Sequence, residues 1–90
     1  MRKSDLIESV SAFTNLHKAD VRAVIENVTL TIQRKIAEGE IIYLRGFGTF
    51  TKKVRKAKIG RNVKRGVSME VPEHSIPFFK PARSFKEKLL

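Results

Sequence analysis

The sequence predicts an α+β fold: a helical hairpin, then a three-stranded antiparallel sheet with a long β-ribbon arm, then a short C-terminal helix. Three observations predict it. Apolar residues recur at helical spacing in the first part of the chain, and they alternate with polar residues at positions 67–71. Between these regions, residues 52–65 contain eight Lys or Arg and no acidic residue. A chain of 90 residues is expected to form one domain.

A first helix of about three turns is predicted near the N-terminus, because apolar residues occur there at i, i+1, i+4 and i+7. These residues are Leu6, Ile7, Val10 and Phe13. Ser4 or Asp5 can accept hydrogen bonds from the first free N–H groups of this helix. The Thr-Asn pair at positions 14–15 marks its end.

A second, longer helix is predicted over about residues 18–38, again from the apolar period. Its apolar face consists of Val21, Val24, Ile25, Val28, Ile32 and Ile36. Val, Ile and Thr lose side-chain freedom in helices, but a strand of about twenty residues would be exceptional, so the period decides. Gly39 can take a positive φ and ends the helix. The two apolar stripes can face each other as a hairpin.

After Gly39 the apolar pattern becomes that of strands. Residues 41–44 form a short strand, the Arg-Gly pair at 45–46 offers a turn, and residues 47 to about 58 read as one long second strand. The alternating segment at 67–71 pairs with it and ends at Pro72. Turn-forming Gly and Asn residues lie between them, which places the tip of an antiparallel ribbon near residues 62–64.

The C-terminal part is predicted to be extended and then helical. Residues 76–79 are extended, and Pro77 and Pro81 constrain their backbone. A last helix begins after Pro81, with Phe85 and Leu89 four residues apart on one face. If the ribbon leaves the core, roughly seventy residues must bury five of the six Phe residues and two helical stripes, so we expect a dimer.

The positive charge of the chain lies mostly in its second half. The formal net charge is +10, of which residues 1–45 carry +1 and residues 46–90 carry +9. Like charges as dense as those of residues 52–65 repel one another, so this stretch needs open solvent or a polyanion. Because structure-forming sequence flanks it on both sides, a nucleic acid is the leading explanation and a solvated linker the weaker one.

The residue inventory argues against an enzyme or a metalloprotein. There is no Cys, and His17 and His74 are far apart without further ligands at metal-binding spacing. The glycines at 46 and 48 lack the third glycine of a dinucleotide loop, and no Ser lies in a nucleophile elbow. We therefore expect no catalytic residue, no metal, no cofactor and no small-molecule substrate.

The same inventory bounds the compartment. The longest apolar run, residues 41–44, is far too short to span a membrane. Charges within the first ten residues exclude a secretory signal. A small, soluble, basic protein of a reducing, intracellular compartment is predicted, with no membrane partner.

Three motifs point to a family: residues 46–50 (GFGTF), 60–62 (GRN) and 77–81 (PFFKP). Their order and spacing resemble the bacterial histone-like DNA-binding proteins, the HU and integration host factor family, over essentially the whole chain. The resemblance implies an intertwined dimer, a homodimer or a heterodimer with a paralogue, in the cytoplasm at the nucleoid. Its two arms would enter the minor groove of double-stranded DNA and bend it. Residues 1–50 and 72–90 would form the dimer core, and about 52–71 the arm.

Two positions depart from the family pattern at the tip of the arm. Val63 stands where the family usually has a Pro that wedges between base pairs, and Arg65 where it usually has Thr or Asn. Val63 is apolar and can still press on a base step as the wedge. It lacks the fixed φ of Pro, which puts the depth of the kink in doubt, and Arg65 adds charge at the tip.

The candidate DNA-binding residues form two groups. On the arm they are Lys52, Lys53, Arg55, Lys56, Lys58, Arg61, Asn62, Lys64 and Arg65. On the core, the residues that resemble the family's phosphate contacts are Lys3, Lys80, Arg83 and Lys86. Alternation places Lys53, Arg55 and Ala57 on one face of the ribbon and Lys52, Val54, Lys56 and Lys58 on the other. Both faces are basic, so the ribbon can lie in a groove between phosphates.

The aromatic residues are assigned to the core of the dimer. They are Phe47, Phe50, Phe79 and Phe85. Minor-groove contacts discriminate poorly between A·T and T·A pairs, so little sequence specificity is expected. The alternatives are an RNA-binding or ribosome-associated basic protein and a scaffold that binds anionic surfaces. The first would more often expose aromatic residues for stacking, and the arm has none.

Overall fold

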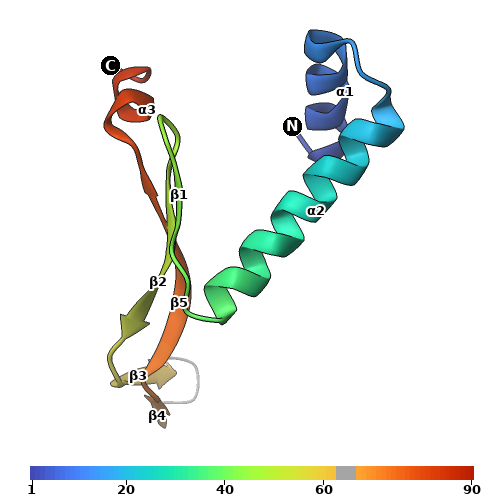
Figure 1. The fold of residues 1–90 in the computed structure, drawn as a ribbon. Helices are drawn as coiled ribbons and strands as arrows, with labels where there is room; N and C mark the ends of the chain where they lie inside the picture. Colours follow the sequence, from blue (N-terminus) through green and yellow to red (C-terminus); the bar gives the residue numbers. More distant parts are fainter. Residues whose placement is uncertain (63–66) are drawn as a thin grey trace. The chain divides into compact units, whose positions relative to one another are not determined.

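The computed structural model describes residues 1–62 and 67–90, with side chains described outside residues 58–71. Its helices and strands follow one another as α1 (Lys3–Thr14), α2 (Lys18–Ala37), β1 (Ile42–Leu44), β2 (Gly48–Arg55), β3 (Lys58–Asn62), β4 (Val67–Val71), β5 (His74–Pro81) and α3 (Arg83–Glu87) (Figure 1). Two compact units comprise residues 1–35 and 36–90.

The first unit is the predicted helical hairpin. Asp5 acts at the start of α1, where its Oδ2 accepts the backbone N–H of Arg2 at 2.9 Å. Asn15 ends α1 with a left-handed φ of 62°, which Asn adopts more readily than most residues. Two ion pairs join α1 to α2. They are Lys3 Nζ–Glu26 Oε1 at 2.9 Å and Lys18 Nζ–Glu8 Oε1 at 3.1 Å.

The apolar stripes of the two helices are only partly covered. Ile7 of α1 and Val21 of α2 are buried, but Phe13 is 92% exposed and Val24 and Val28 are exposed as well. The reason is geometric, because two helices that cross can each cover only part of the other's stripe. A large part of the predicted apolar surface of the two helices is therefore exposed in the single chain.

The second unit contains the predicted three-stranded antiparallel sheet, in the order β1-β2-β5. Ile42 pairs with Phe50, Gly48 with Pro81 and Arg55 with His74. Gly48 is required by close approach: a Cβ there would lie 2.5 Å from Cε1 of Phe79 and 2.6 Å from the carbonyl oxygen of Lys80.

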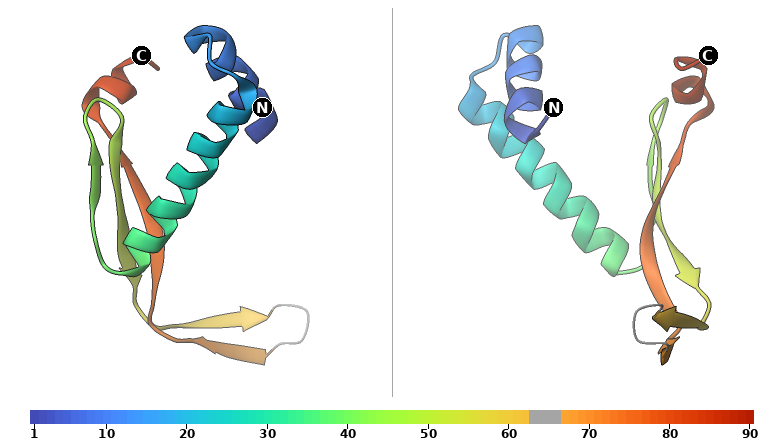
Figure 2. Two further views of the ribbon diagram at one scale, coloured as in Figure 1. Left: turned by 45° about the vertical axis from the view of Figure 1, so that its right-hand side comes forward. Right: turned by 180° about the vertical axis from the view of Figure 1, so that it is seen from behind.

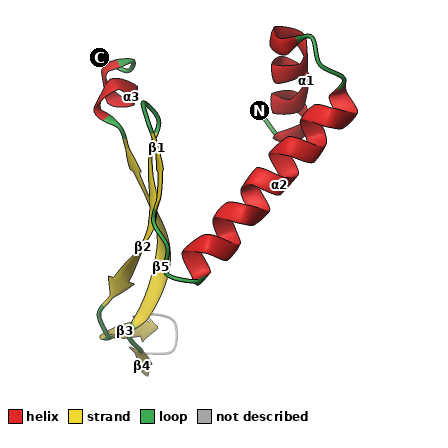
Figure 3. Cartoon of the chain, viewed as in Figure 1, coloured by secondary structure: helices red, strands yellow, loops and turns green. Residues whose placement is uncertain are grey.

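The long second strand predicted over residues 47–58 is two strands in the structure. β2 ends at Arg55 and β3 begins at Lys58, and β3 pairs with β4 in a separate two-stranded sheet from Lys58↔Val71 to Asn62↔Val67. The interruption faces Pro72 and Glu73 on the returning chain (Figure 3). Pro72 has no N–H to donate to the ladder, although Pro77 lies within β5 without interrupting it.

The β3–β4 pair lies at the end of the sheet opposite α3 (Figure 2). The antiparallel ribbon is thus confirmed as far as Asn62↔Val67. The predicted tip falls on residues outside the described part, including Val63, Lys64 and Arg65.

The C-terminal helix begins after Pro81, as predicted, but it ends at Glu87, so Leu89 lies beyond it. α3 is joined to the β1–β2 turn by two hydrogen bonds. The backbone N–H of Ala82 donates to the carbonyl of Phe47 at 2.8 Å, and Ser84 Oγ donates to the carbonyl of Gly46 at 3.2 Å. Gly46 holds a φ of 80° in this turn.

Candidate nucleic-acid interface

Strand register gives the β1-β2-β5 sheet two chemically different faces. Residues paired directly across antiparallel strands share a face, and successive residues alternate. One face, called here the apolar face, carries Ile42, Leu44, Phe50, Val54 and Phe79. The other, called here the basic face, carries Tyr43, Thr49, Thr51, Lys53, Arg55, His74, Ile76, Phe78 and Lys80. None of the three strands contains an acidic residue.

The four aromatic residues assigned to the dimer core come together in one cluster. Ring centroids of Phe50 and Phe79 are 4.7 Å apart, those of Phe47 and Phe79 are 5.1 Å apart, and those of Phe47 and Phe85 are 5.4 Å apart. These are favourable separations for aromatic pairs. Phe47 nevertheless stays 45% exposed. The four rings of the cluster come from one chain, but that chain does not bury them completely.

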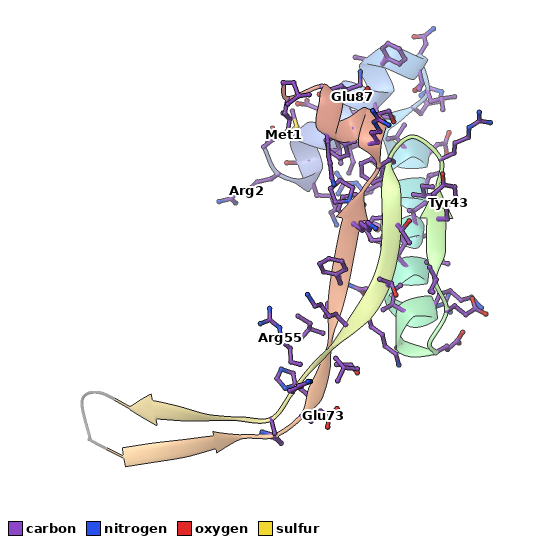
Figure 4. The ribbon with its side chains drawn as sticks, turned by 90° about the vertical axis from the view of Figure 1, so that its left-hand side faces the viewer. Met1, Arg2, Tyr43, Arg55, Glu73 and Glu87 are labelled. Carbon is purple, nitrogen blue, oxygen red and sulfur yellow. The ribbon has the colours of Figure 1, made fainter. Side chains whose placement is uncertain are left out.

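Lys53 and Arg55 lie on the basic face, near the end of β2. Lys53 Nζ lies 5.2 Å from the centroid of the Phe78 ring, which is a cation–π contact. Arg55 pairs with His74 in the last register position before the interruption, next to Glu73 (Figure 4). Ala57, predicted to share their face, lies beyond the end of β2, as does Lys56.

Lys52 is on the opposite side of the sheet from these two residues. It alternates with Lys53 and so belongs to the apolar face, and a Cβ at Gly39 would be 4.0 Å from its Nζ. Gly39 is the second residue after the C-terminal end of α2, and the carbonyls at a helix C-terminus favour a cation. The charge of Lys52 therefore lies beside a helix end, away from Lys53 and Arg55.

The predicted phosphate contacts of the core have different surroundings. Lys3 is paired with Glu26, and its hydrogen bond and charge hold the pKa of the Glu26 carboxyl below its usual range. Arg83 Nε contacts Glu87 Oε1 at 3.2 Å within α3. Lys80 is exposed on the basic face opposite Thr49, and Lys86 is exposed on α3. The ion pairs are at the surface, where such pairs stabilise little.

The outer arm residues are placed only in part. Lys58, Arg61 and Asn62 lie on β3, and their side chains are outside the described ones. Val63, Lys64 and Arg65 lie outside the described residues altogether. Their roles in binding stay predictions.

Tyr43 and Phe78 are the aromatic residues of the basic face, and neither was predicted as a site residue. In the sequence, Tyr43 is part of an apolar run and Phe78 is part of an extended segment. The signal that separates them from their neighbours is strand register, which pairs Tyr43 with Thr49 and Phe78 with Thr51. Alternation alone does not say which face is covered.

In the described part of the chain, no group of three or more His, Cys, Asp or Glu side chains is placed to hold a metal ion. Nor does any helix of that part combine the length and apolar character needed to cross a membrane.

The model of one protein family, described as bacterial DNA-binding protein, matches residues 1–90. The chain belongs to this family. HU from Streptococcus pyogenes is 39% identical over 85 residues, which cover 94% of this chain and 93% of that protein. The beta subunit of integration host factor from Methylococcus capsulatus is 34% identical over 90 residues, covering 99% and 95%. The resemblance to the HU and integration host factor family is confirmed.

The family fold is also found in solved structures. Anabaena HU, in a cocrystal structure with DNA, matches with a TM-score of 0.94 and 34% identity. The match covers 99% of this chain and 97% of that one. The predicted fold class, with its helical hairpin, three-stranded sheet, ribbon and short C-terminal helix, is confirmed.

Proposed function

We propose that this protein is an architectural DNA-binding protein. It binds the minor groove of double-stranded DNA with its β-ribbon arms, bends the duplex and compacts it, with little sequence specificity. The main support for this proposal is that the β2–β5 ladder leads into the β3–β4 ribbon. Residues 52–65, which include β3, contain eight Lys or Arg and no acidic residue. The Anabaena relative that shares the fold was crystallised with DNA.

The physical basis is electrostatic and geometric. A two-stranded ribbon can enter a DNA groove, and Lys or Arg on both of its faces can neutralise phosphates on either side. The minor groove presents nearly the same acceptors for A·T and T·A pairs, so base readout is weak. Affinity should therefore fall steeply with salt and vary little with sequence.

The functional unit is a dimer. Phe13, Val24 and Val28 are exposed on the helices of one chain, and the aromatic cluster leaves Phe47 half open. Exposed apolar residues this numerous mark an interface, and a second copy or a paralogue would cover them. The resulting division assigns residues 1–50 and 72–90 to the dimer core and about 52–71 to the arm.

The proposed DNA contacts keep the two groups derived from the sequence. Arg55, Lys58 and Arg61 grip phosphates along the arm, and Val63 presses on a base step at the tip. Lys80 and Lys86 are exposed and free to meet phosphates beside the core, and Lys3 and Arg83 join them. The protein has no catalytic role, and it acts at the nucleoid in the bacterial cytoplasm. The RNA-binding alternative is not favoured by the family.

Three measurements test the function and the dimer together. Gel shifts over linear, nicked and RNA duplexes should show tighter binding to nicked than to linear DNA and weak binding to duplex RNA. Light scattering should give twice the mass of the 10.3 kDa chain, and the unfolding midpoint should rise with protein concentration. A 10.3 kDa monomer with a constant midpoint would exclude the dimer.

A further inference from the structure

β5 forms one of the two edges of the β1-β2-β5 sheet, and it is the longer of the two. In the described part of the chain β2 is its only strand neighbour, so one side of its eight-residue backbone is an open edge. The other edge strand, β1, has three residues. An open edge presents free N–H and C=O groups to which another chain can add a strand. A very short edge offers little for such pairing, whereas β5 is long enough to need protection.

The register shows which backbone groups of β5 face the open edge. Residues opposite each other in an antiparallel pair alternate between hydrogen-bonded and non-hydrogen-bonded pairs. The backbone N–H of Ala82 donates to the carbonyl of Phe47 at 2.8 Å, one position beyond the pairing of Pro81 with Gly48. Even-numbered residues of β5 therefore bond to β2, and odd-numbered residues direct their N–H and C=O groups toward the open edge.

Both prolines of β5 fall on outward positions. The four outward residues are Ser75, Pro77, Phe79 and Pro81. The ladder passes Pro77, opposite Lys52, without interruption because an N–H at this position would face away from β2. The open edge thus offers four carbonyls but only two N–H groups, those of Ser75 and Phe79. A strand added at this edge would find every second donor missing.

The residues around Pro77 form a segment that would otherwise favour self-association. Residues 74–79 (HSIPFF) contain no Lys, Arg, Asp or Glu, and their Ile and Phe residues favour strands. Apart from its proline, this segment fits the pattern of short, uncharged, strand-forming segments that stack with copies of themselves. Pro77 and Phe78 are exposed in the single chain, so the segment is accessible to another molecule.

We propose that the open edge of β5 is a surface for strand addition by a second copy of this chain, and that Pro77 and Pro81 keep it closed. With an N–H at both positions, two β5 edges could pair antiparallel and join the sheets of two molecules. A dimer has two such edges, so this pairing would link dimers into open chains rather than a closed assembly. The two prolines confine association to the dimer.

Pro77→Thr tests the proposal because it supplies an N–H and a strand-forming side chain at an outward position. Light scattering at rising protein concentration should show the variant forming species heavier than the parent. Each pair of β5 edges gains two hydrogen bonds, so the concentration at which larger species appear should fall roughly 5- to 100-fold. Ser75→Thr is the matched control. It places the same side chain at an outward position that already has an N–H, and it should keep the mass of the parent.

Hydrogen exchange measures the direction of the new amide without relying on association. In dilute Pro77→Thr, the amide at position 77 should exchange as fast as an exposed amide, whereas the amide of Phe78, which pairs with Thr51, should be protected. At concentrations where larger species form, the amide at position 77 should become protected as well. Pro81→Thr restores the other missing donor and should associate in the same direction, which keeps the proposal testable if Pro77→Thr does not fold.

Three results would overturn the proposal. The first is a folded proline variant whose mass equals that of the parent at every concentration. The second is equal association of Pro77→Thr and Ser75→Thr, which would assign the effect to the threonine side chain. The third is protection of the amide at position 77 in dilute solution, which would mean that this position faces β2. Each comparison is made with the parent mass and without DNA, so none of them depends on the proposed DNA binding.

Discussion

The β2–β5 ladder and the β3–β4 ladder are built from the same two passes of the chain, yet different forces stabilise them. The β2–β5 ladder has β1 along one edge and the Phe50–Phe79 pair on one face. The β3–β4 ladder is a separate two-stranded sheet with five residues in each strand. Three or more strands, or packing against a helix, are normally needed for independent stability in water.

The difference separates stability from binding along a single ribbon. Changes to the packed residues of the β2–β5 ladder should act on folding. Changes to the basic residues at the end of that ladder and in the β3–β4 ladder should act on DNA affinity. The region with little to bury is also the region with dense positive charge, which a polyanion can stabilise. Four predictions test this separation, from the largest expected effect to the smallest.

A Gly→Ala substitution should destabilise the protein when it is placed in the β2–β5 ladder and should have little effect on stability when it is placed in the β3–β4 ladder. Gly48→Ala puts a Cβ 2.5 Å from the Phe79 ring and 2.6 Å from the backbone of Lys80, so the strands must shift. We expect a loss of about 1–3 kcal/mol in the free energy of unfolding, measured by urea denaturation. Gly60→Ala on β3 is the matched control and should change it by no more than about 0.5 kcal/mol. Equal losses in both variants would erase the distinction.

Replacing Arg55, Lys58 and Arg61 together with Ala should weaken binding to every DNA sequence. Each phosphate contact that is lost should lower the slope of log affinity against log salt by about 0.9. The free energy of unfolding should stay within about 0.5 kcal/mol of the parent. Arg34→Ala serves as the control, since Arg34 is exposed on α2 and belongs to neither group of proposed contacts. Parental DNA affinity in the triple variant would show that the arm is not the binding element.

Substitutions of Val63 should change how the protein discriminates between DNA shapes. An apolar wedge localises a bend at one unstacked base step, and a fixed φ lowers the entropy lost on ordering it. We expect Val63→Pro to raise the ratio of nicked to linear affinity and Val63→Ala to lower it, in gel shifts at constant salt. Both variants should bind straight duplex about equally. If Val63→Ala leaves the ratio and the bend angle unchanged, Val63 is a spacer.

The smallest effect concerns pH and the helices rather than the ribbon. Lys3 lowers the pKa of Glu26 in the folded protein from its ordinary value of 4.5. The pair therefore stabilises the fold above pH 4.5, and this contribution is lost as the pH falls through the lowered value. Glu26→Gln should remove a slight dependence of the thermal midpoint on pH in that acidic range. Both side chains of the pair are exposed, so a large shift would point to another group.

Local patterns predicted the helices and most strands because their causes are local. The helical period and Gly39 predicted the ends of α2 to within one residue. The Thr-Asn pair predicted the end of α1, which Asn15 caps. The break after Arg55 was not predictable from residues 47–58 themselves. The residues opposite the break are Pro72 and Glu73, which lie far along the chain.

The candidate site shows the same limit. The arm was visible as a run of charge, and each family motif is a run of three to five consecutive residues. Partners across the fold were not visible: Lys3 meets Glu26 23 residues away, and Lys53 meets Phe78 only through strand register. The charge run was enough to predict which residues are basic. The strand register was needed to show that Lys52 lies on the apolar face and Lys53 on the basic face.

The interruption between the two ladders omits two residues on each pass of the chain, 56–57 and 72–73. Pairing positions before and after it remain in phase, since Arg55↔His74 and Lys58↔Val71 belong to one continuous count. The alternation of side chains between the two faces is therefore the same in both ladders, although the residues between the ladders are not paired. A one-residue insertion on a single side would invert every side chain of that strand beyond the joint. The linker can vary in composition, but its length must stay matched on the two passes.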